Sequence, residues 1–459
     1  MAKIVLATMG SLGDLYPFVA IGLALKAIGH EPVIASHDVY RETVEHVDLR
    51  FHAMRPGKQD VLDRTGLDMA GLVLRATEDP WFLLRDVYLP FTPMMFDDVT
   101  AAAAGASAIV AHNWAFGAII AAEALDIPLA RVALSPLFLQ SAIRPSVTGN
   151  APYLMEPRGR LGVAYNRVVR EVVRRQLARK MRPADAFRRR LDLPAGDRDH
   201  VFDFGRPGTA ERVLAIYSPA LARLEEDHSG KAVLCGFPRL DPSGLPLPDG
   251  LKEYLRNGPE PVVFTLGSFV ASAGLDFYRS GIAACRALGQ RSVVISGEDQ
   301  FDELQPLVQS DTFLCSYAPH ARLFPHARAI VHHGGIGTTG EAMRSGKPQL
   351  VIPFLGDQPD NCRRLVASGV ARELLIARRP GPPCVDEIVA ALRPLIEDRG
   401  YAIAGSAIAG RLISEHGASR AAQEIDRILT GSMVDTVVPM HPAAALNVRA
   451  NDLVQSEAA

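Results

Sequence analysis

A short apolar run, a glycine-rich turn and a helix follow one another at residues 329–344, and this unit constrains the fold more than any other stretch. The pattern predicts a buried strand at residues 329–331, a tight turn at residues 332–337 (HHGGIG) and a helix at residues 338–344. The N–H groups and positive dipole end of that helix form an anion site that glycines let a ligand approach closely. The unit therefore predicts a parallel α/β sheet that binds a diphosphate.

Polar side chains suited to a nucleotide sugar follow this turn. Glu341 lies about one helical turn after Thr338, where its carboxylate can reach ribose hydroxyls. Asp357 and Gln358 follow the apolar run 349–354, at the expected carboxyl end of its strand, where open parallel sheets bind ligands. A lone glycine-rich turn is more commonly a connection that binds nothing. The combination favours a binding site.

The pattern HHGG-x-GTT-x-E followed by P-x-x-x-DQ resembles the donor-binding signature of the GT-B nucleotide-sugar glycosyltransferases. Within the UDP-glycosyltransferase superfamily, the resemblance is to the bacterial natural-product and glycolipid branch. It implies an α/β fold of two facing Rossmann-like domains with a cleft between them. It also implies that Glu341 contacts the ribose and that Asp357 with Gln358 contacts the donor sugar. The implied diphosphate site is formed by His333, Gly335, Gly337 and Thr338.

The resemblance extends to two upstream segments. Tyr317-Ala318-Pro319-His320 resembles the family's W-x-P-Q/H element, whose aromatic ring stacks on the pyrimidine base. Tyrosine in place of tryptophan offers a smaller stacking face. Ser268, after the predicted strand 261–267, resembles a Ser or Thr that contacts the diphosphate, although a serine there could also be a simple helix cap. The implied donor is a UDP-sugar or dTDP-sugar, with no cofactor and no metal.

The amino terminus carries an independent signal. An apolar strand at 3–9, a loop at 10–17 (GSLGDLYP) and an apolar helix at 18–28 predict a β-loop-α start without the G-x-G-x-x-G fingerprint of dinucleotide binding. The loop resembles the glycosyltransferase opening, which implies that Asp14 faces the acceptor as a catalytic base. A helix-capping role is the structural alternative. An ordinary aspartate, with a pKa of about 3.9, is poorly matched to an alcohol, and a phenolic acceptor would ease that demand.

A second polar residue supports the base in the family. It follows the strand that here ends in AIVAHNW, so the resemblance places His112 or Asn113 in that role. The family more often has Asp at this position, and a histidine after a strand is usually a satisfied structural residue.

Length and composition indicate two domains. The chain has 459 residues, of which 48% are hydrophobic, and strands alternate with helices in both halves. A proline-rich stretch marks the interdomain linker. We expect an acceptor domain at residues 1–235 and the linker at 236–260. A donor domain closed by a helix near 418–429 is expected at 261–430, followed by a loosely packed or disordered tail at 431–459.

Charge and motif content exclude several classes of function. The net charge of −2 gives no reason to expect a nucleic-acid partner. No apolar run is long enough for a membrane span and no signal peptide is recognisable, so a cytoplasmic protein is expected. The five cysteines form no C-x-x-C pair, which argues against a disulfide framework or a zinc site and favours core thiols.

Residues 158–190 break the overall neutrality, with twelve Lys or Arg against two acids and interleaved apolar residues. One interpretation is a helix on an anionic membrane surface near a lipid acceptor. The other, which the pattern favours, is a solvated helix whose apolar stripe covers the acceptor pocket. Apolar stretches at 81–91 and 114–120 suit an apolar or aromatic acceptor pocket and suit an ordinary core equally well.

Together these features predict an inverting glycosyltransferase that moves a hexose, first of all from UDP-glucose, to a hydroxyl of a phenolic, polyketide or terpenoid acceptor. The alternatives are a rhamnosyl or glucosyl transferase acting on a lipid, a UDP-sugar epimerase, and a non-catalytic nucleotide-sugar-binding protein. The acceptor, the donor sugar, the regiochemistry and the oligomeric state are left open by the sequence.

Overall fold

The computed structural model describes residues 1–147, 156–157, 159–194, 201–203, 205, 210–240, 246–271, 274–375 and 383–431, with the side chain of Phe269 left out. The predicted tail, apart from its first residue, lies outside the described residues.

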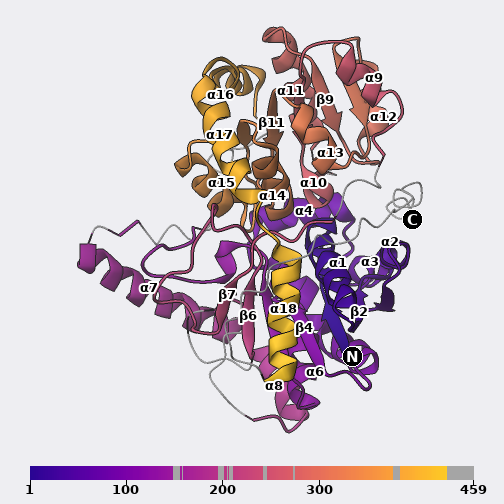
Figure 1. Cartoon of the computed structure of the whole chain (residues 1–459), viewed down its shortest axis with the longest axis vertical. Coiled ribbons are helices and arrows are strands. Elements are labelled where there is room, and N and C mark those ends of the chain that lie inside the picture. Colours follow the sequence, from indigo (N-terminus) through magenta and orange to yellow (C-terminus); the bar gives the residue numbers. More distant parts are fainter. Residues whose placement is uncertain are drawn as a thin grey trace.

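Two separate parallel sheets form the two lobes seen in Figure 1. The first sheet has the order β3-β2-β1-β4-β5-β6-β7 and contains β1 (Lys3–Ala7), β2 (Glu31–Ser36), β3 (Arg50–Ala53), β4 (Ala108–His112), β5 (Leu129–Ala133), β6 (Arg212–Ala215) and β7 (Ala232–Leu234). The second has the order β10-β9-β8-β11-β12-β13 and contains β8 (Val262–Thr265), β9 (Ser292–Ile295), β10 (Thr312–Cys315), β11 (Ala329–His332), β12 (Gln349–Val351) and β13 (Ala371–Glu373). The prediction of two Rossmann-like domains is confirmed.

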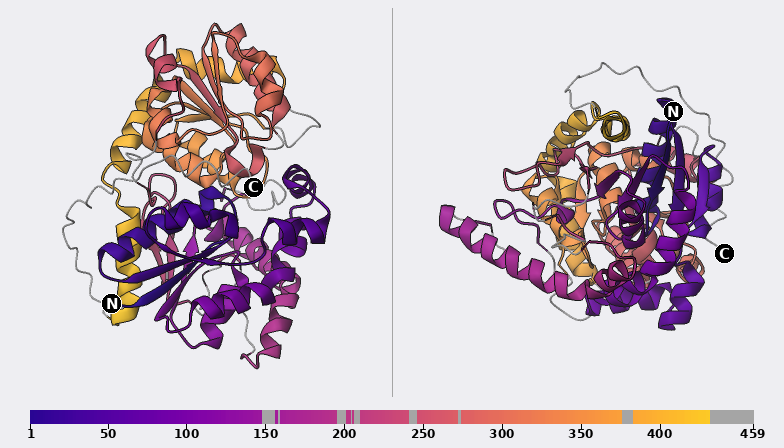
Figure 2. Two further views of the ribbon diagram at one scale, coloured as in Figure 1. Left: turned by 90° about the vertical axis from the view of Figure 1, so that its right-hand side faces the viewer. Right: turned by 90° about the horizontal axis from the view of Figure 1, so that it is seen from below.

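Helices flank both sheets, as the left view of Figure 2 shows. Because the central strands are covered on both faces, they are apolar almost throughout rather than alternating. The first lobe contains α1 (Leu12–Ala27), α2 (Arg41–Glu45), α3 (Lys58–Thr65), α4 (Met69–Glu78), α5 (Thr92–Ala102), α6 (Phe116–Ala124), α7 (Gly159–Lys180) and α8 (Arg182–Arg190). The later helices are α9 (Leu251–Arg256), α10 (Gly267–Val270), α11 (Leu275–Ala287), α12 (Phe301–Leu304), α13 (His320–Leu323), α14 (Ile336–Ser345), α15 (Gln358–Ala367), α16 (Val385–Glu397), α17 (Arg399–Leu412) and α18 (Gly417–Thr430).

The last helix lies on the other lobe from the one predicted. We expected it to close the second domain, but α18 packs against α1 and β6 of the first (Figure 1). His30 and Arg212 of the first lobe lie within 3.1 Å and 3.6 Å of carboxylates on α18, those of Asp426 and Glu424. Periodicity identified the helix and could not tell which sheet would bury its apolar face, because that choice depends on the path of the chain after α17.

The prediction of a loop at 10–17 was also wrong, because α1 begins at Leu12 and contains Pro17. Ser11 and Asp14 form a reciprocal capping box at its start. The signature Ser-x-x-Asp was readable in the sequence as a helix start. Four cysteines are buried as predicted, whereas the fifth, Cys384, is exposed; all five are free.

Candidate functional site

Each sheet reverses its strand order at one place, between β1 and β4 in the first and between β8 and β11 in the second. Ligands bind outside the carboxyl ends of parallel strands at such points. The helices that follow β1 and β11, α1 and α14, contact each other across the lobes. A Cβ atom on Gly337 would lie 3.3 Å from Cα of Gly13. The candidate site is therefore formed between the two switch points.

Asp14 lies in the first turn of α1, directly after the central strand β1. Its Oδ2 accepts hydrogen bonds from the backbone N–H of Ser11 at 2.7 Å and from the Ser11 hydroxyl at 3.1 Å. Gly10 has φ +124°, and a Cβ there would lie 2.3 Å from the same oxygen. Glycine is required at position 10 on both counts. Asp14 thus caps the helix at the switch point of the first sheet.

Burial raises the pKa of Asp14 to about 7, and the charge of Asp357 on the opposite lobe contributes; the hydrogen bonds from Ser11 oppose the shift only in part. Burial likewise raises the pKa of Asp357 to about 6 against the neighbouring Asn361 amide and Ser135 hydroxyl, which favour the carboxylate. A carboxyl group that titrates near neutral pH is a better general base than an ordinary aspartate. The raised pKa therefore reduces the mismatch between the Asp14 carboxylate and an alcohol proton.

His112 is the last residue of β4, which pairs with β1, and Asn113 follows it. The ring of His112 is buried edge-on between Phe18 and Phe138, and burial lowers its pKa to about 3. The backbone of Met9 opposes this shift only in part. Asn113 accepts a hydrogen bond from Arg131 at 3.2 Å. These contacts bury both residues in the first lobe, and burial keeps His112 neutral.

Aromatic side chains lie beside Asp14. Tyr88 stacks on Trp114 with ring centroids 5.1 Å apart, and Phe138 meets Trp114 edge-on at 6.2 Å. Burial first, and then the charge of Asp14, raise the pKa of the Tyr88 hydroxyl above its usual range. Both stretches that suggested an apolar pocket in the sequence, 81–91 and 114–120, contribute to this wall. Aromatic faces of this kind suit contact with a flat apolar ligand.

On the donor side, His333 follows β11 and lies against the glycine-rich turn. A Cβ on Gly335 would lie 2.3 Å from His333 Nε2, so only glycine leaves room for the imidazole. Burial lowers the pKa of His333 to about 3, with smaller contributions from His332 and His320. Its Nδ1 is buried without a partner among the described residues. A neutral imidazole at a helix start can donate one hydrogen bond to an anion.

The glycine-rich turn is held in place by side chains around it. His332 binds the Gln349 side chain at 3.0 Å and accepts from the N–H of Gly334 at 3.1 Å, so it has a structural role. Asn361 donates to the carbonyl of Gly334 and to Asp357, both at 2.9 Å. One buried amide therefore connects the turn to the predicted sugar-binding carboxylate. Asn361 was not found from the sequence, although its i+4 spacing from Asp357 was visible there.

The remaining diphosphate candidates lie at two helix starts. The N-cap of α14, Gly335, provides no side-chain cap, so the first N–H groups of that helix point into the turn. Thr338 is buried in the first turn of helix α14, next to Thr339. Ser268 is exposed in the four-residue helix α10, directly after β8. All of these groups belong to the switch point of the second sheet.

Glu341 lies in α14 and is approached by Arg239 from the stretch between the lobes, with 3.8 Å between the charged groups. Burial raises the pKa of Glu341 although Arg239 opposes the shift. A cavity of about 40 Å³ beside Glu341 is lined by Gly13, Pro17 and Gly337 among others. That volume holds a few water molecules and is too small for a ribose. A ribose at Glu341 therefore requires Arg239 to move or the lobes to part.

The two nucleoside candidates differ in their surroundings. Tyr317 follows β10 and is half-buried. His320 begins α13, stacks on Phe324 with ring centroids 4.5 Å apart, and lies 3.4 Å from the hydroxyl of Thr265. Burial lowers its pKa to about 4. His320, three residues after Tyr317 in the chain, is therefore neutral and held in place by these contacts.

Asp357 and Gln358 begin α15 after β12, as predicted. The side-chain oxygen of Gln358 accepts from the N–H groups of Phe354 and Leu355, at 2.8 Å and 3.1 Å. Its NH₂ group is then the part suited to a ligand hydroxyl.

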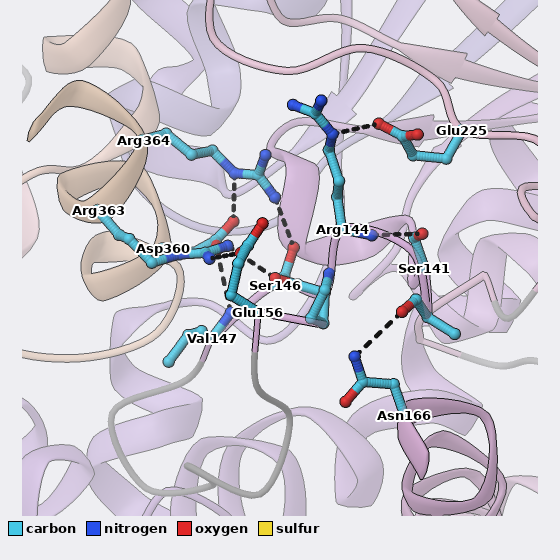
Figure 3. A network of polar contacts seen from close by, with 12 residues as sticks. Ser141, Arg144, Ser146, Val147, Glu156, Asn166, Glu225, Asp360, Arg363 and Arg364 are labelled. Carbon is cyan, nitrogen blue, oxygen red and sulfur yellow. Dashed lines mark hydrogen bonds and ion pairs between the residues drawn. The ribbon is translucent and has the colours of Figure 1, made fainter. Parts of the chain in front are cut away.

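One turn further along α15, Asp360 connects the lobes (Figure 3). The carboxylate is fully buried and accepts from the N–H of Val147 at 3.0 Å and from Arg364 at 2.7 Å. Arg364 also donates to the Ser146 hydroxyl at 3.2 Å, and Arg363 donates to the carbonyl of Pro145 at 2.7 Å. The helix that presents Asp357 thus holds a segment of the first lobe. Sequence inspection missed this network, since its members are more than 200 positions apart.

Two further properties concern ligands and membranes. In the part of the chain that the structure describes, no group of three or more His, Cys, Asp or Glu side chains could hold a metal ion. No described helix has both the length and the apolar character needed to cross a membrane.

Known proteins match both lobes. Residues 4–143 match the glycosyltransferase family 28 N-terminal domain, and residues 289–430 match the erythromycin biosynthesis protein CIII-like C-terminal domain. Glycosyltransferase GtfC of Amycolatopsis orientalis is 31% identical over 428 residues, which cover 90% of this chain and 97% of the relative. The O-mycaminosyltylonolide 6-deoxyallosyltransferase of Streptomyces fradiae is 27% identical over 440 residues, 91% of this chain and 96% of the relative.

The architecture matches solved structures as well. The crystal structure of the glycotransferase of kitacinnamycin aligns with a TM-score of 0.68 at 22% identity, covering 93% of this chain and 99% of that one. The fold is GT-B, as the resemblance implied.

Proposed function

Because the chain belongs to the natural-product glycosyltransferases of the GT-B fold, we propose that it moves a hexose, with UDP-glucose as the first candidate donor, to a hydroxyl of a small apolar or aromatic acceptor. The observation that carries the proposal is the position of Asp14. Burial raises its pKa to about 7, it lies at the switch point of the first sheet, and the charge of Asp357 in the second lobe contributes to the shift.

The proposed reaction is a single displacement. The acceptor oxygen attacks the anomeric carbon, the bond from that carbon to the diphosphate oxygen breaks, and Asp14 takes the acceptor proton. One displacement inverts the anomeric configuration. The shifted pKa supports this role because Asp14 is largely ionised at pH 8 and still basic enough to accept a proton late in the transition state.

The departing diphosphate needs stabilisation as its charge develops. We assign this to the N-terminal N–H groups of α14, including Gly335 and Gly337, to the hydroxyls of Thr338 and Ser268, and to the unpartnered nitrogen of His333. These groups are already oriented, which limits reorganisation during the reaction. No metal or other cofactor is required in this scheme.

The rest of the donor is proposed to lie along the carboxyl edge of the second sheet. Tyr317, with His320 behind it, would hold the base, and Glu341 would bind the ribose once Arg239 withdraws. Asp357 and the NH₂ group of Gln358 would bind sugar hydroxyls. Hydroxyls of this kind occur in several hexoses, and the relative named for 6-deoxyallosyl transfer makes a dTDP-deoxysugar the second candidate donor.

The acceptor is proposed to lie against the wall formed by Tyr88, Trp114 and Phe138, beside Asp14. His112 and Asn113 would shape this wall and hold Asp14 in an apolar setting. The aromatic surface favours a phenolic or polyketide acceptor over a charged one. A lipid acceptor that presents a hydroxyl to Asp14 would obey the same chemistry.

The proposal is tested by mass spectrometry of the purified protein with UDP-glucose and then dTDP-sugars against phenols, polyketides, terpenoids and hydroxylated lipids. The expected product is one acceptor plus one hexose, with the inverted anomeric configuration by NMR. Retained configuration would exclude the single displacement. Free epimerised UDP-sugar would support an epimerase, and nucleotide binding without any product would support a non-catalytic binding protein.

A further inference from the structure

Helix α7 attaches to the first lobe by polar side chains in addition to apolar ones. The side that faces the protein carries Asn166, Arg170 and Arg174 along with Leu177. Asn166 donates to the carbonyl of Ala142, at 3.0 Å (Figure 3). Surface helices normally bury their apolar stripe and expose their charges. Here polar groups attach the helix to the lobe.

The opposite side of α7 carries an apolar stripe in solvent. Leu161, Tyr165, Val168 and Val172 are spaced by four, three and four residues, which places them on one face. Leu161 is 86% exposed and Val168 is 65% exposed. The apolar residues that the sequence analysis grouped into one stripe divide: Val173 packs against the core of the first lobe, whereas Val168 and Val172 are exposed. Periodicity reveals that a stripe exists, whereas the polar contacts on the other side decide which way it points.

Charge surrounds this stripe. Gly159–Lys180 contains seven Lys or Arg and a single acid, Glu171, whose carboxylate is bound by Arg174 and Arg175. Arg160, Arg167, Arg175 and Arg179 are exposed. The helix is roughly 33 Å long and extends from the body of the protein in both figures of the whole chain. It therefore presents apolar side chains bordered by cations.

We propose that α7 is a membrane-docking helix that lies on the surface of a bilayer containing anionic lipids. The apolar stripe would enter the acyl boundary while the bordering arginines contact phosphate and carboxylate headgroups. A second copy of the chain fits less well, because two such helices repel each other and a stripe of four side chains is far from the roughly 1,000 Å² of a stable interface. Docking in this manner is independent of which donor or acceptor the enzyme uses.

The experiment measures sedimentation of the full chain with phosphatidylcholine vesicles, with and without phosphatidylserine. We expect binding only when phosphatidylserine is present, and weakening at high salt as charges are screened. Leu161→Glu combined with Val168→Glu should weaken binding at least about tenfold. Arg160→Gln with Arg167→Gln leaves the stripe intact and should weaken binding to anionic vesicles to a smaller degree.

The matched control is Ile403→Glu with Ile413→Glu, because both isoleucines are exposed, 70% and 77%, and neither lies on α7. Ile403 lies within α17 and Ile413 is the residue after its end. This variant should bind vesicles like the unmodified protein. Unchanged binding in the Leu161/Val168 variant, or no binding of the unmodified protein to anionic vesicles, would overturn the proposal. A concentration-dependent dimer that the same variant abolishes, without vesicle binding, would instead identify a second copy as the occupant.

Discussion

Replacing Asp14 by Asn should abolish transfer and, at the same time, stabilise the protein above neutral pH. The unfolded chain loses the Asp14 proton near the ordinary aspartate pKa of 3.8, while the folded protein holds it until about pH 7. The contribution of protonated Asp14 to the stability of the folded protein is therefore fully present below pH 3.8 and is lost as the pH rises towards 7. A shift of about three pKa units corresponds to about 4 kcal/mol of unfolding free energy. This figure is an upper bound, because the side chain is only partly shielded from solvent.

The asparagine of the Asp14→Asn variant cannot ionise, so the variant avoids this loss. Its side-chain oxygen can still accept from Ser11, and we assign about 1 kcal/mol to the weaker cap. The variant should then be slightly less stable at pH 4 and up to about 3 kcal/mol more stable at pH 8. For a domain of this size that gain raises the midpoint of thermal unfolding by several degrees, about 2–4 °C per kcal/mol.

The assay compares thermal unfolding of both proteins at pH 5 and pH 8. Taking the difference between the proteins cancels titrations they share, and the advantage of the variant should grow by about 2 kcal/mol between these pH values. In parallel, kcat/KM of the unmodified enzyme should fall to about one tenth of its plateau at pH 6, and the variant should lose at least about a hundredfold. An advantage that does not change with pH, together with retained turnover, would refute both the buried-base argument and the role of Asp14.

The remaining predictions concern the donor side and the contact between the lobes. Gly335→Ala should displace the His333 ring, since a Cβ there would lie 2.3 Å from Nε2, and should weaken UDP affinity by about tenfold or more in calorimetry; equal affinity would show that the ring does not need this space. Glu341→Ala should weaken UDP binding by about tenfold through lost ribose hydrogen bonds, and an unaltered dissociation constant would remove the ribose assignment. Asp360→Asn should lower the free energy of unfolding in urea by about 2–4 kcal/mol, because it leaves partly buried arginines without their carboxylate, whereas the exposed control Glu397→Gln should change it by less than about 1 kcal/mol. Treatment with EDTA should leave turnover unchanged, and a loss restored by Mg²⁺ would contradict the metal-independent scheme.

Much of the donor site could be predicted because its geometry is local. Gly335, Thr338 and Glu341 lie within one turn and the helix that follows, so the order of residues nearly determines their relative positions. The Ser11–Asp14 cap is equally local, and the prediction of a loop there overlooked a readable signal. The two Rossmann-like domains followed from the alternation of strands and helices, which is repeated in both halves.

Other features depend on where distant segments meet. Asp360 binds Val147, and Arg239 approaches Glu341, across separations that no local pattern encodes. The helix α18 was correctly recognised and assigned to the wrong lobe for the same reason.

By itself, the sequence determined the two-domain α/β class, the glycine-rich turn before α14 and the identity of the polar groups around it. These properties depend on backbone conformation and on residues a few positions apart. Only the tertiary structure decided that Asp14 has a pKa near 7, that His112 and His333 are neutral, and that the apolar face of α7 points outward. Each of those depends on how much water and which charges surround a side chain, and burial is produced by the whole chain folding together.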